Sequence, residues 1–229
     1  MATIVDPTAA NSQPVDPQAA AISRALGNHY AATFAAHGPT AKGVDWGPAA
    51  DVRLRYEKML SVIEPHIAAE RTVSLLDVGC GYGGLLEHAE SRGLKLDYTG
   101  IDMAGNMIEH ARGAFPQAQF WHGDVLALAH PRQFDYVICN GILTQKLLAS
   151  ILAMNAFAQQ LMRKLFDLSC RGVAFNIMSN QVNFMADNLY YRSPVEVLSF
   201  ALSELTRKVR IDHAYRLYEY TVYLYREEP

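Results

Sequence analysis

The sequence has no uninterrupted apolar run of the roughly 20 residues that a helix needs to cross a bilayer. It also lacks an excess of positive charge, because its 229 residues carry 20 Lys and Arg against 23 Asp and Glu, a formal net charge of -3. An obligate nucleic-acid partner calls for cations that neutralise phosphates. We therefore expect no membrane and no nucleic acid as partner, but a small molecule, with monomer and homodimer both left open.

Cysteine is scarce: Cys80, Cys139 and Cys170 lie far apart in the chain, each within an apolar segment. This spacing fits neither a disulfide framework nor a zinc site, so we expect no metal and three core thiols in a reducing compartment. Residues 1–7 also lack the basic region followed by an apolar stretch that is typical of a secretion signal. A cytoplasmic protein is the expectation.

Half of the residues are hydrophobic, enough for one substantial core. Residues 1–15 contain prolines and polar residues with little to bury, which predicts a mobile N-terminal arm. Apolar residues then recur with helical spacing over 16–36 and from Val52 to Ile63, which predicts two helices. We expect residues 16–65 to form an N-terminal helical lid that is compact with the main domain, residues 66–229.

From residue 73 onward, short apolar segments alternate with amphipathic ones, which is typical of βαβ units and a parallel sheet. Two β-rich segments near the end, 207–213 and 217–225, are joined by too few residues for a parallel crossover and must pair antiparallel. The predicted fold is α/β, a Rossmann-like seven-stranded sheet, mostly parallel and ending in an antiparallel hairpin, with helices on both faces. The predicted strands before the hairpin are 73–78, 96–101, 118–122, 134–139 and 172–178, and the predicted helices between them are 84–92, 104–113 and 145–168.

A glycine-rich run, Gly79-Cys80-Gly81-Tyr82-Gly83-Gly84, follows the first predicted strand. Its glycines let the backbone approach a ligand closely, and Asp102 ends the next strand, where it can bind a ribose. The run therefore predicts a nucleoside site. Because it satisfies G-x-G-x-x-G as well as G-x-G-x-G, it leaves a nicotinamide dinucleotide and other nucleosides open.

Three further features argue against a dinucleotide. Asp77 lies two residues before the first glycine, where a carboxylate would repel a pyrophosphate but suit a cationic ligand. Gly123-Asp124-Val125 follows the third strand, which places a carboxylate and a backbone amide where an adenine edge can be read. The terminal hairpin, finally, is not a feature that a dehydrogenase sheet needs.

Together these residues resemble the class I S-adenosylmethionine-dependent methyltransferases, from about Val73 to Tyr225. The resemblance implies S-adenosyl-L-methionine as cofactor and S-adenosyl-L-homocysteine as product. It also implies that the strand 134–139, followed by Asn140, ends at the reacting methyl group. The implied cofactor contacts are Asp77, Gly79 and Gly81 for the methionine part, Asp102 for the ribose, Met103 for an adenine face, and Asp124 with Val125 for the adenine edge.

The N-terminal part is similar to one small-molecule branch of that family in the pieces around His37-Gly38-Pro39, Gly43-Val44-Asp45-Trp46 and Arg55-Tyr56-Glu57. Three of its side chains are candidates for the cofactor pocket. Tyr30 either lines it or packs in the core, and Trp46 lies in a glycine-bounded loop of the kind that serves ligands. Arg55 either clamps the methionine carboxylate with its planar fork or stays solvated.

Candidates for the acceptor side are fewer. His29, His37 and His213 could act as a base, since imidazole titrates near neutral pH. We favour His37 as the catalytic residue because it precedes a Gly-Pro loop expected to close over the site. Tyr190 and Tyr191 either line the acceptor pocket or pack against the terminal hairpin.

The predicted function is methyl transfer from S-adenosylmethionine to an O or N atom of a small metabolite or natural-product intermediate. Three alternatives stay open: an NAD(P)-dependent oxidoreductase, a methyltransferase acting on nucleic acid or protein, and a non-catalytic cofactor-binding partner protein. Amino methylases that act on bases often carry Asn or Asp followed by Pro-Pro and an aromatic residue after the fourth strand, where this chain has Asn140-Gly141-Ile142-Leu143. The missing base-stacking residue makes the nucleic-acid alternative weaker.

Overall fold

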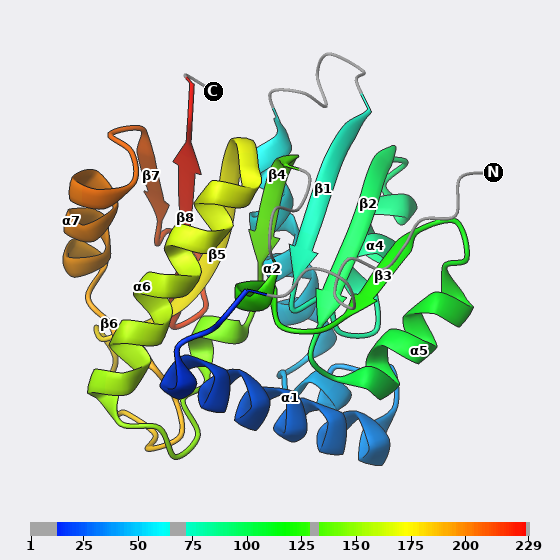
Figure 1. Cartoon of the computed structure of the whole chain (residues 1–229), viewed down its shortest axis with the longest axis horizontal. Coiled ribbons are helices and arrows are strands. Elements are labelled where there is room, and N and C mark those ends of the chain that lie inside the picture. Colours follow the sequence, from blue (N-terminus) through cyan, green and yellow to red (C-terminus); the bar gives the residue numbers. More distant parts are fainter. Residues whose placement is uncertain (1–12, 65–71, 129–132, 228–229) are drawn as a thin grey trace.

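The protein is described by a computed structural model for residues 13–64, 72–128 and 133–227. Its strands form one sheet in the order β3-β2-β1-β4-β5-β8-β7, parallel from β3 to β5 and antiparallel where β8 pairs with β5 and β7 (Figure 1). The predicted fold class and the terminal hairpin are confirmed, and a short additional strand, β6, pairs with β5. The strands are β1 (Val73–Val78), β2 (Leu96–Asp102), β3 (Gln119–His122), β4 (Phe134–Cys139), β5 (Ser169–Ser179), β6 (Tyr191–Arg192), β7 (Val209–Asp212) and β8 (Glu219–Tyr225).

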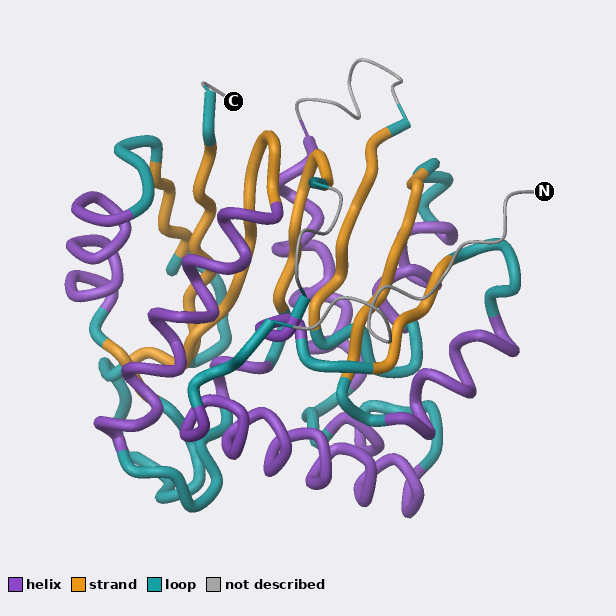
Figure 2. The backbone as a smooth tube through the Cα atoms, in the orientation of Figure 1, coloured by secondary structure: helices purple, strands orange, loops and turns teal. Residues whose placement is uncertain are grey.

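Helices cover both faces of the sheet (Figure 2). Side chains alternate along β1, so that Leu76 and Val78 join one core cluster while Val73 and Leu75 join the other. The first cluster includes α6 and α7, and the second includes α2 and α4. The helices are α1 (Pro17–His37), α2 (Ala49–Leu60), α4 (Gly84–Ser91), α5 (Gly105–Ala114), α6 (Ile151–Leu168) and α7 (Pro194–Glu204), with 3-10 turns η1 (Lys42–Val44), η2 (Ser61–Ile63), η3 (Val125–Ala127) and η4 (Ile142–Thr144).

Helix α6 begins later than the sequence indicates. The predicted start at residue 145 is wrong, because Ser150 caps the helix by accepting a hydrogen bond from the Ala153 amide, and the first helical residue is Ile151. The residues before it form a loop in which the amides of Lys146 and Leu147 both donate to the Asn188 carbonyl. Apolar periodicity continues through this loop, so it does not mark the helix boundary.

Helix α1 crosses the end of the sheet toward which the β1 arrowhead points (Figure 1). Asp16 caps it by accepting from the amides of Gln18 and Ala19, and Pro17 occupies its first turn. Inside the helix, a Cβ on Gly27 would stand 2.6 Å from the Cβ of Met103. Glycine therefore lets α1 approach the end of β2 closely enough to cover it.

The predicted mobile arm is described only at its end. Gln13 donates through its amide to the Ala127 carbonyl and through its side chain to the Leu126 carbonyl, so residues 13–15 lie against η3. Residues 1–12, and the predicted boundary between lid and main domain at 65 and 66, lie outside the described residues.

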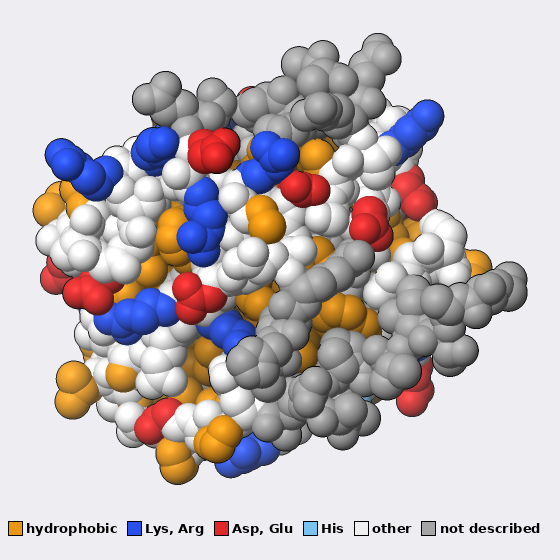
Figure 3. All heavy atoms as spheres, turned by 45° about the horizontal axis from the view of Figure 1, so that its top comes forward, with side chains coloured by type: hydrophobic (Ala, Val, Ile, Leu, Met, Phe, Trp, Pro, Cys, Tyr) orange, Lys and Arg blue, Asp and Glu red, His pale blue; other side chains and the backbone are white. Residues whose placement is uncertain are grey.

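The molecular face seen in Figure 3 carries Lys and Arg interspersed with Asp and Glu. Within the three described ranges, every helix is too short or too polar to cross a membrane. The same ranges contain no group of three or more His, Cys, Asp or Glu side chains placed to hold a metal ion.

Candidate functional site

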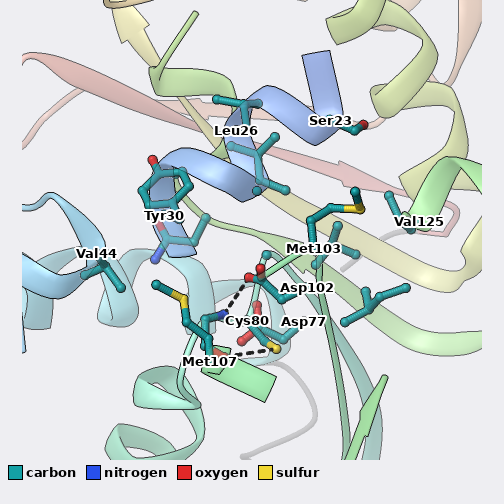
Figure 4. Close-up of a pocket in the computed structure, with 18 of the residues that line it drawn as sticks. Ser23, Leu26, Tyr30, Val44, Asp77, Cys80, Asp102, Met103, Met107 and Val125 are labelled. Carbon is teal, nitrogen blue, oxygen red and sulfur yellow. Dashed lines mark hydrogen bonds between the residues drawn. The ribbon is translucent and has the colours of Figure 1, made fainter. Parts of the chain in front are cut away.

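A pocket lies at the carboxyl ends of the central strands, with α1 and the η1 loop covering it; its empty space is about 950 Å³, including the part open to solvent (Figure 4). Ligands of open α/β sheets bind at this edge. The structure brings ten of the predicted cofactor residues together in its lining, and their binding roles stay predictions. These ten are Tyr30, Trp46, Asp77, Gly79, Gly81, Asp102, Met103, Asp124, Val125 and Asn140.

The glycine-rich turn between β1 and α4 forms one wall of the pocket. Gly79 and Gly81 adopt positive φ angles of 77° and 54°, a region that side chains with a Cβ rarely enter. A Cβ on Gly79 would also come within 2.9 Å of Ile142. The backbone conformation of the turn therefore favours glycine at both positions. As a result, no side chain at either position projects into the pocket.

Asp102 ties this turn to the end of β2. Its Oδ2 accepts from the Gly81 amide and its Oδ1 from the Ala104 amide, each at 2.8 Å. Burial raises the pKa of the carboxyl, and the two backbone donors oppose that rise. A carboxylate offers about four lone-pair sites, so two amides leave room for the hydroxyls of a ribose.

Asp77 lies deeper, with a residue exposure of 2 %. The hydroxyl of Tyr98 donates to its Oδ2 at 2.6 Å, but burial dominates and raises the pKa of Asp77 to about 7, with a further rise from the Asp102 charge. A cation placed beside this carboxyl would favour its ionised form. The chemistry of the residue therefore fits a ligand that carries an ammonium or sulfonium group.

The opposite wall is more apolar. Met103, directly after β2, and Val125, the first residue of η3, lie on the same side of the pocket (Figure 4). Asp124 accepts from the Leu126 amide at 2.9 Å and so caps η3. Asp124 therefore caps η3 and also lines the pocket.

Asn140 follows β4 and is 7 % exposed. Among the described residues, neither its side-chain oxygen nor its nitrogen has a hydrogen-bond partner. A buried polar group left unpaired costs roughly 1–3 kcal/mol, so this amide indicates a ligand that supplies the missing partners. Together with the glycine turn and Asp77, it fits a nucleoside that carries an amino-acid group.

The lid contributes Tyr30 and Trp46 to the lining. Burial raises the pKa of Tyr30 well above its usual value, and the nearby Asp45 carboxylate adds to the rise. Arg55 does not line the pocket, because its guanidinium is paired with Glu219 and lies 5.1 Å from the Trp46 ring centroid. Its Nη1 is buried without a partner among the described residues.

The structure does not bring the predicted acceptor-side residues into the pocket lining. His37 is exposed at the last position of α1. Tyr190 is 1 % exposed, and its hydroxyl donates to Asn155 on α6. Tyr191 accepts at its hydroxyl from the Ala186 amide. Both tyrosines therefore have structural partners in this arrangement.

Sequence reasoning missed other residues around the pocket. Ser23, Leu26 and Gly27 line it from α1, and the glycine inside a helical pattern is a signal of close backbone approach that could have found this face. His29 pairs with Asp45 at 3.0 Å, and the same carboxylate oxygen accepts from Gln145. These contacts hold α1 and the η1 loop to the turn after β4.

Comparisons with known proteins agree with this geometry. The family described as "Methyltransferase domain" matches residues 75–164. Rv1506c of Mycobacterium tuberculosis, whose name assigns it to the methyltransferases, is 32 % identical over 152 residues, which cover 65 % of this chain and 90 % of that protein. The trans-aconitate 2-methyltransferase of Escherichia coli K12 is 28 % identical over 101 residues, 43 % of this chain and 40 % of that enzyme. The chain belongs to the methyltransferase family.

Solved structures share the fold. The magnesium protoporphyrin IX methyltransferase of Synechocystis PCC 6803, crystallised with S-adenosylhomocysteine, superposes with a TM-score of 0.63 at 14 % identity and covers 89 % of this chain and 99 % of its own. CalS10, an amino pentose methyltransferase from Micromonospora echinaspora crystallised with S-adenosylmethionine, gives 0.54 at 14 % identity, with 80 % and 98 % covered. The predicted resemblance to class I methyltransferases is confirmed.

Proposed function

We propose that the protein transfers the methyl group of S-adenosylmethionine to an oxygen or nitrogen atom of a small metabolite or a natural-product intermediate. The observation that carries this proposal is the unpaired Asn140 amide, which lies in one pocket with the buried Asp77 carboxyl and the Gly79 turn. When bound, the cofactor supplies an electrophilic methyl group on a sulfonium sulfur. The chain's own part is to bind, orient and exclude water.

Each wall of the pocket has a task in this proposal. Asp77 faces the positive charge of the methionine part, and Asp102 accepts from the ribose hydroxyls with the lone pairs that Gly81 and Ala104 leave free. Met103, Asp124 and Val125 enclose the adenine, and Tyr30 and Trp46 close the pocket from the lid. Tyr30 and Trp46 act by packing.

The reaction is an in-line displacement, and holding donor and acceptor at near-attack distance in a dry site is worth up to roughly 7–11 kcal/mol. If the acceptor loses a proton, a base adds about 10²–10⁴-fold. His37 stays our proposed base and Tyr190 and Tyr191 stay proposed acceptor contacts. All three would have to reach the pocket by a rearrangement, since none lines it.

Support for a small acceptor comes from the relatives' names, which mention trans-aconitate, magnesium protoporphyrin IX and an amino pentose. These acceptors differ from one another, so they support the size class and not one compound. An NAD(P)-dependent oxidoreductase is less well supported, because the Asp77 carboxyl occupies the end of β1 where a pyrophosphate would be repelled.

Isothermal titration with S-adenosylhomocysteine and with NADH tests the proposal. We expect saturable one-site binding of S-adenosylhomocysteine and no heat with NADH. Turnover of S-adenosylmethionine with a panel of small alcohols, amines and carboxylic acids then separates an enzyme from a non-catalytic cofactor-binding partner. Binding without turnover of any acceptor would favour the non-catalytic role.

A further inference from the structure

A buried carboxylate, Glu219, lies at the pocket end of the sheet, at the first position of β8, and is 1 % exposed. Arg55 of α2 donates to it three times: Nε to Oε1 at 3.0 Å, Nε to Oε2 at 3.0 Å and Nη2 to Oε2 at 2.9 Å. Asn176 of β5 adds a fourth bond, from Nδ2 to Oε1 at 3.1 Å. The lid helix is thereby joined to two strands of the sheet through one fully paired carboxylate.

Asn176 carries this connection to the turn after β4. Its Oδ1 accepts from the Gly141 amide at 2.8 Å, while its Nδ2 is the donor to Glu219. Gly141 has a φ of 93°, and it directly follows Asn140, whose unpaired amide lies in the pocket. Both side-chain groups of Asn176 are thus used, one toward the turn and one toward the ion pair.

A second route closes the connection into a ring. The Arg55 guanidinium carbon lies 5.1 Å from the centroid of the Trp46 ring. The indole lies on Gly141, where a Cβ would come within 3.0 Å of Cζ2. The ring therefore runs from Gly141 through Asn176, Glu219, Arg55 and Trp46 back to Gly141, and both Trp46 and Gly141 line the pocket.

Stability alone is a poor explanation for this arrangement. A buried ion pair contributes little net free energy of folding, and well-packed apolar residues in its place are often neutral or stabilising. What a ring of directional contacts provides is a fixed relative position for its members. Here the members are one indole of the lid and one backbone turn beside the pocket.

We propose that Arg55, Glu219 and Asn176 are positioning residues that fix the Asn140–Gly141 turn and seat Trp46 against it, so that lid and sheet close the methyl-transfer pocket together. The proposal rests on the proposed function, which makes this pocket the cofactor site. None of the three residues is assigned a contact with the reacting atoms. They act through Gly141 and Trp46.

Trp46 itself reports on the ring. The chain has two tryptophans, so Trp121→Phe leaves Trp46 as the single emitter. In this parent, two double variants separate position from stability. Arg55→Met with Glu219→Met makes the ion pair apolar. Asn176→Asp with Glu219→Gln instead moves the negative charge to position 176: the new carboxylate accepts from the Gly141 amide and from the new side-chain amide, whose oxygen keeps the Arg55 bonds made at Oε2, while the Arg55 Nε bond to Oε1 is lost.

We expect the apolar double variant to fold but to unfold several degrees below the parent, because Asn176 Nδ2 loses its acceptor. It should also emit at longer wavelength and bind S-adenosylhomocysteine at least tenfold more weakly. The charge-relocated variant should match the parent in emission and in Kd. Parent-like emission and Kd in the folded apolar variant would overturn the proposal. If that variant does not fold, loss of binding in a folded charge-relocated variant overturns it, and so does failure of both to fold.

A failure of the proposed function can be told apart from a failure of the ring proposal. If the parent itself does not bind S-adenosylhomocysteine, the cofactor assignment is wrong, while the ligand-free emission still decides whether Trp46 is seated by the ring. A red shift in the apolar variant without ligand then supports the ring, and an unchanged emission overturns it.

Discussion

The hydroxyl of Tyr98 on β2 donates a 2.6 Å hydrogen bond to Oδ2 of Asp77, which lines the pocket near the end of β1. This bond favours the ionised carboxylate, but burial outweighs it and raises the pKa of Asp77 from 3.8 to about 7. The free protein therefore holds a carboxyl that is poised near neutrality, at a place where a cation would complete its ionisation.

Stability should depend on pH through this group. Between about pH 4 and pH 7, folded Asp77 keeps a proton that the unfolded chain releases, so the free energy of unfolding falls as the pH rises and levels off above 7. We expect a loss on the order of 2–4 kcal/mol. Urea unfolding of the ligand-free protein at pH 5 and pH 8 measures it, with Asp77→Asn as the variant that should lose most of the difference. Equal pH dependence in both proteins would contradict the assignment.

Cofactor affinity should move with pH in the opposite sense. Because the positive charge of S-adenosylmethionine favours the ionised carboxyl, its binding should tighten as the pH rises through 7 and should release a proton near that pH. Titrations in buffers of different ionisation enthalpy measure the released proton. Asp77→Asn should bind more weakly and release none, and an unchanged proton count in that variant would refute the role of Asp77.

Asp102→Ala should weaken S-adenosylhomocysteine binding by at least tenfold, because it removes both the proposed ribose acceptor and the bonds that hold the Gly81 and Ala104 amides. Asp135→Ala is the matched control, since Asp135 also accepts from a backbone amide, that of Ser74, but lies at the start of β4, away from the pocket. The control should lose stability and keep its affinity. Equal loss of affinity in both variants would point to a global effect.

Gly141→Ala tests the contact between Trp46 and Gly141. Both Gly141 and Gly93 have positive φ, so an alanine at either position is strained by roughly 1–2 kcal/mol. Only at Gly141 would the new Cβ meet the indole, at 3.0 Å, because nothing lies within 4 Å at Gly93. We expect Gly93→Ala to lower the unfolding temperature alone, and Gly141→Ala also to shift Trp46 fluorescence and weaken cofactor binding. Identical behaviour of the two variants would show that the contact is unimportant.

Much of the cofactor side could be predicted from local sequence. Asp77, Asp102 and Asp124 each lie within two residues of the end of a strand. Because the carboxyl ends of parallel strands meet at one edge of the sheet, residues at these positions come together in the folded chain. The roles of Gly79 and Gly81 could be predicted for a different reason. Their positive φ angles in the strand-to-helix turn are values that residues with a Cβ rarely adopt.

Neither the contacts between lid and sheet nor the acceptor side could be predicted in this way. Arg55 and Glu219 are 164 positions apart, and no periodic pattern connects a polar residue of a lid helix to the first residue of the last strand. Tyr190 shows the opposite case, because its aromatic side chain suggests a pocket residue. Its hydroxyl donates to Asn155 of α6, which becomes its neighbour only in the folded chain.

Isothermal titration of the wild-type protein with S-adenosylhomocysteine, alongside Asp102→Ala and NADH, tests the central claim most directly. We predict saturable one-site binding to the wild type, binding at least tenfold weaker to Asp102→Ala, and no binding of NADH. A folded wild-type protein that gives no heat with S-adenosylhomocysteine or S-adenosylmethionine, but binds NADH, would contradict the claim that this pocket is a methyl-donor site.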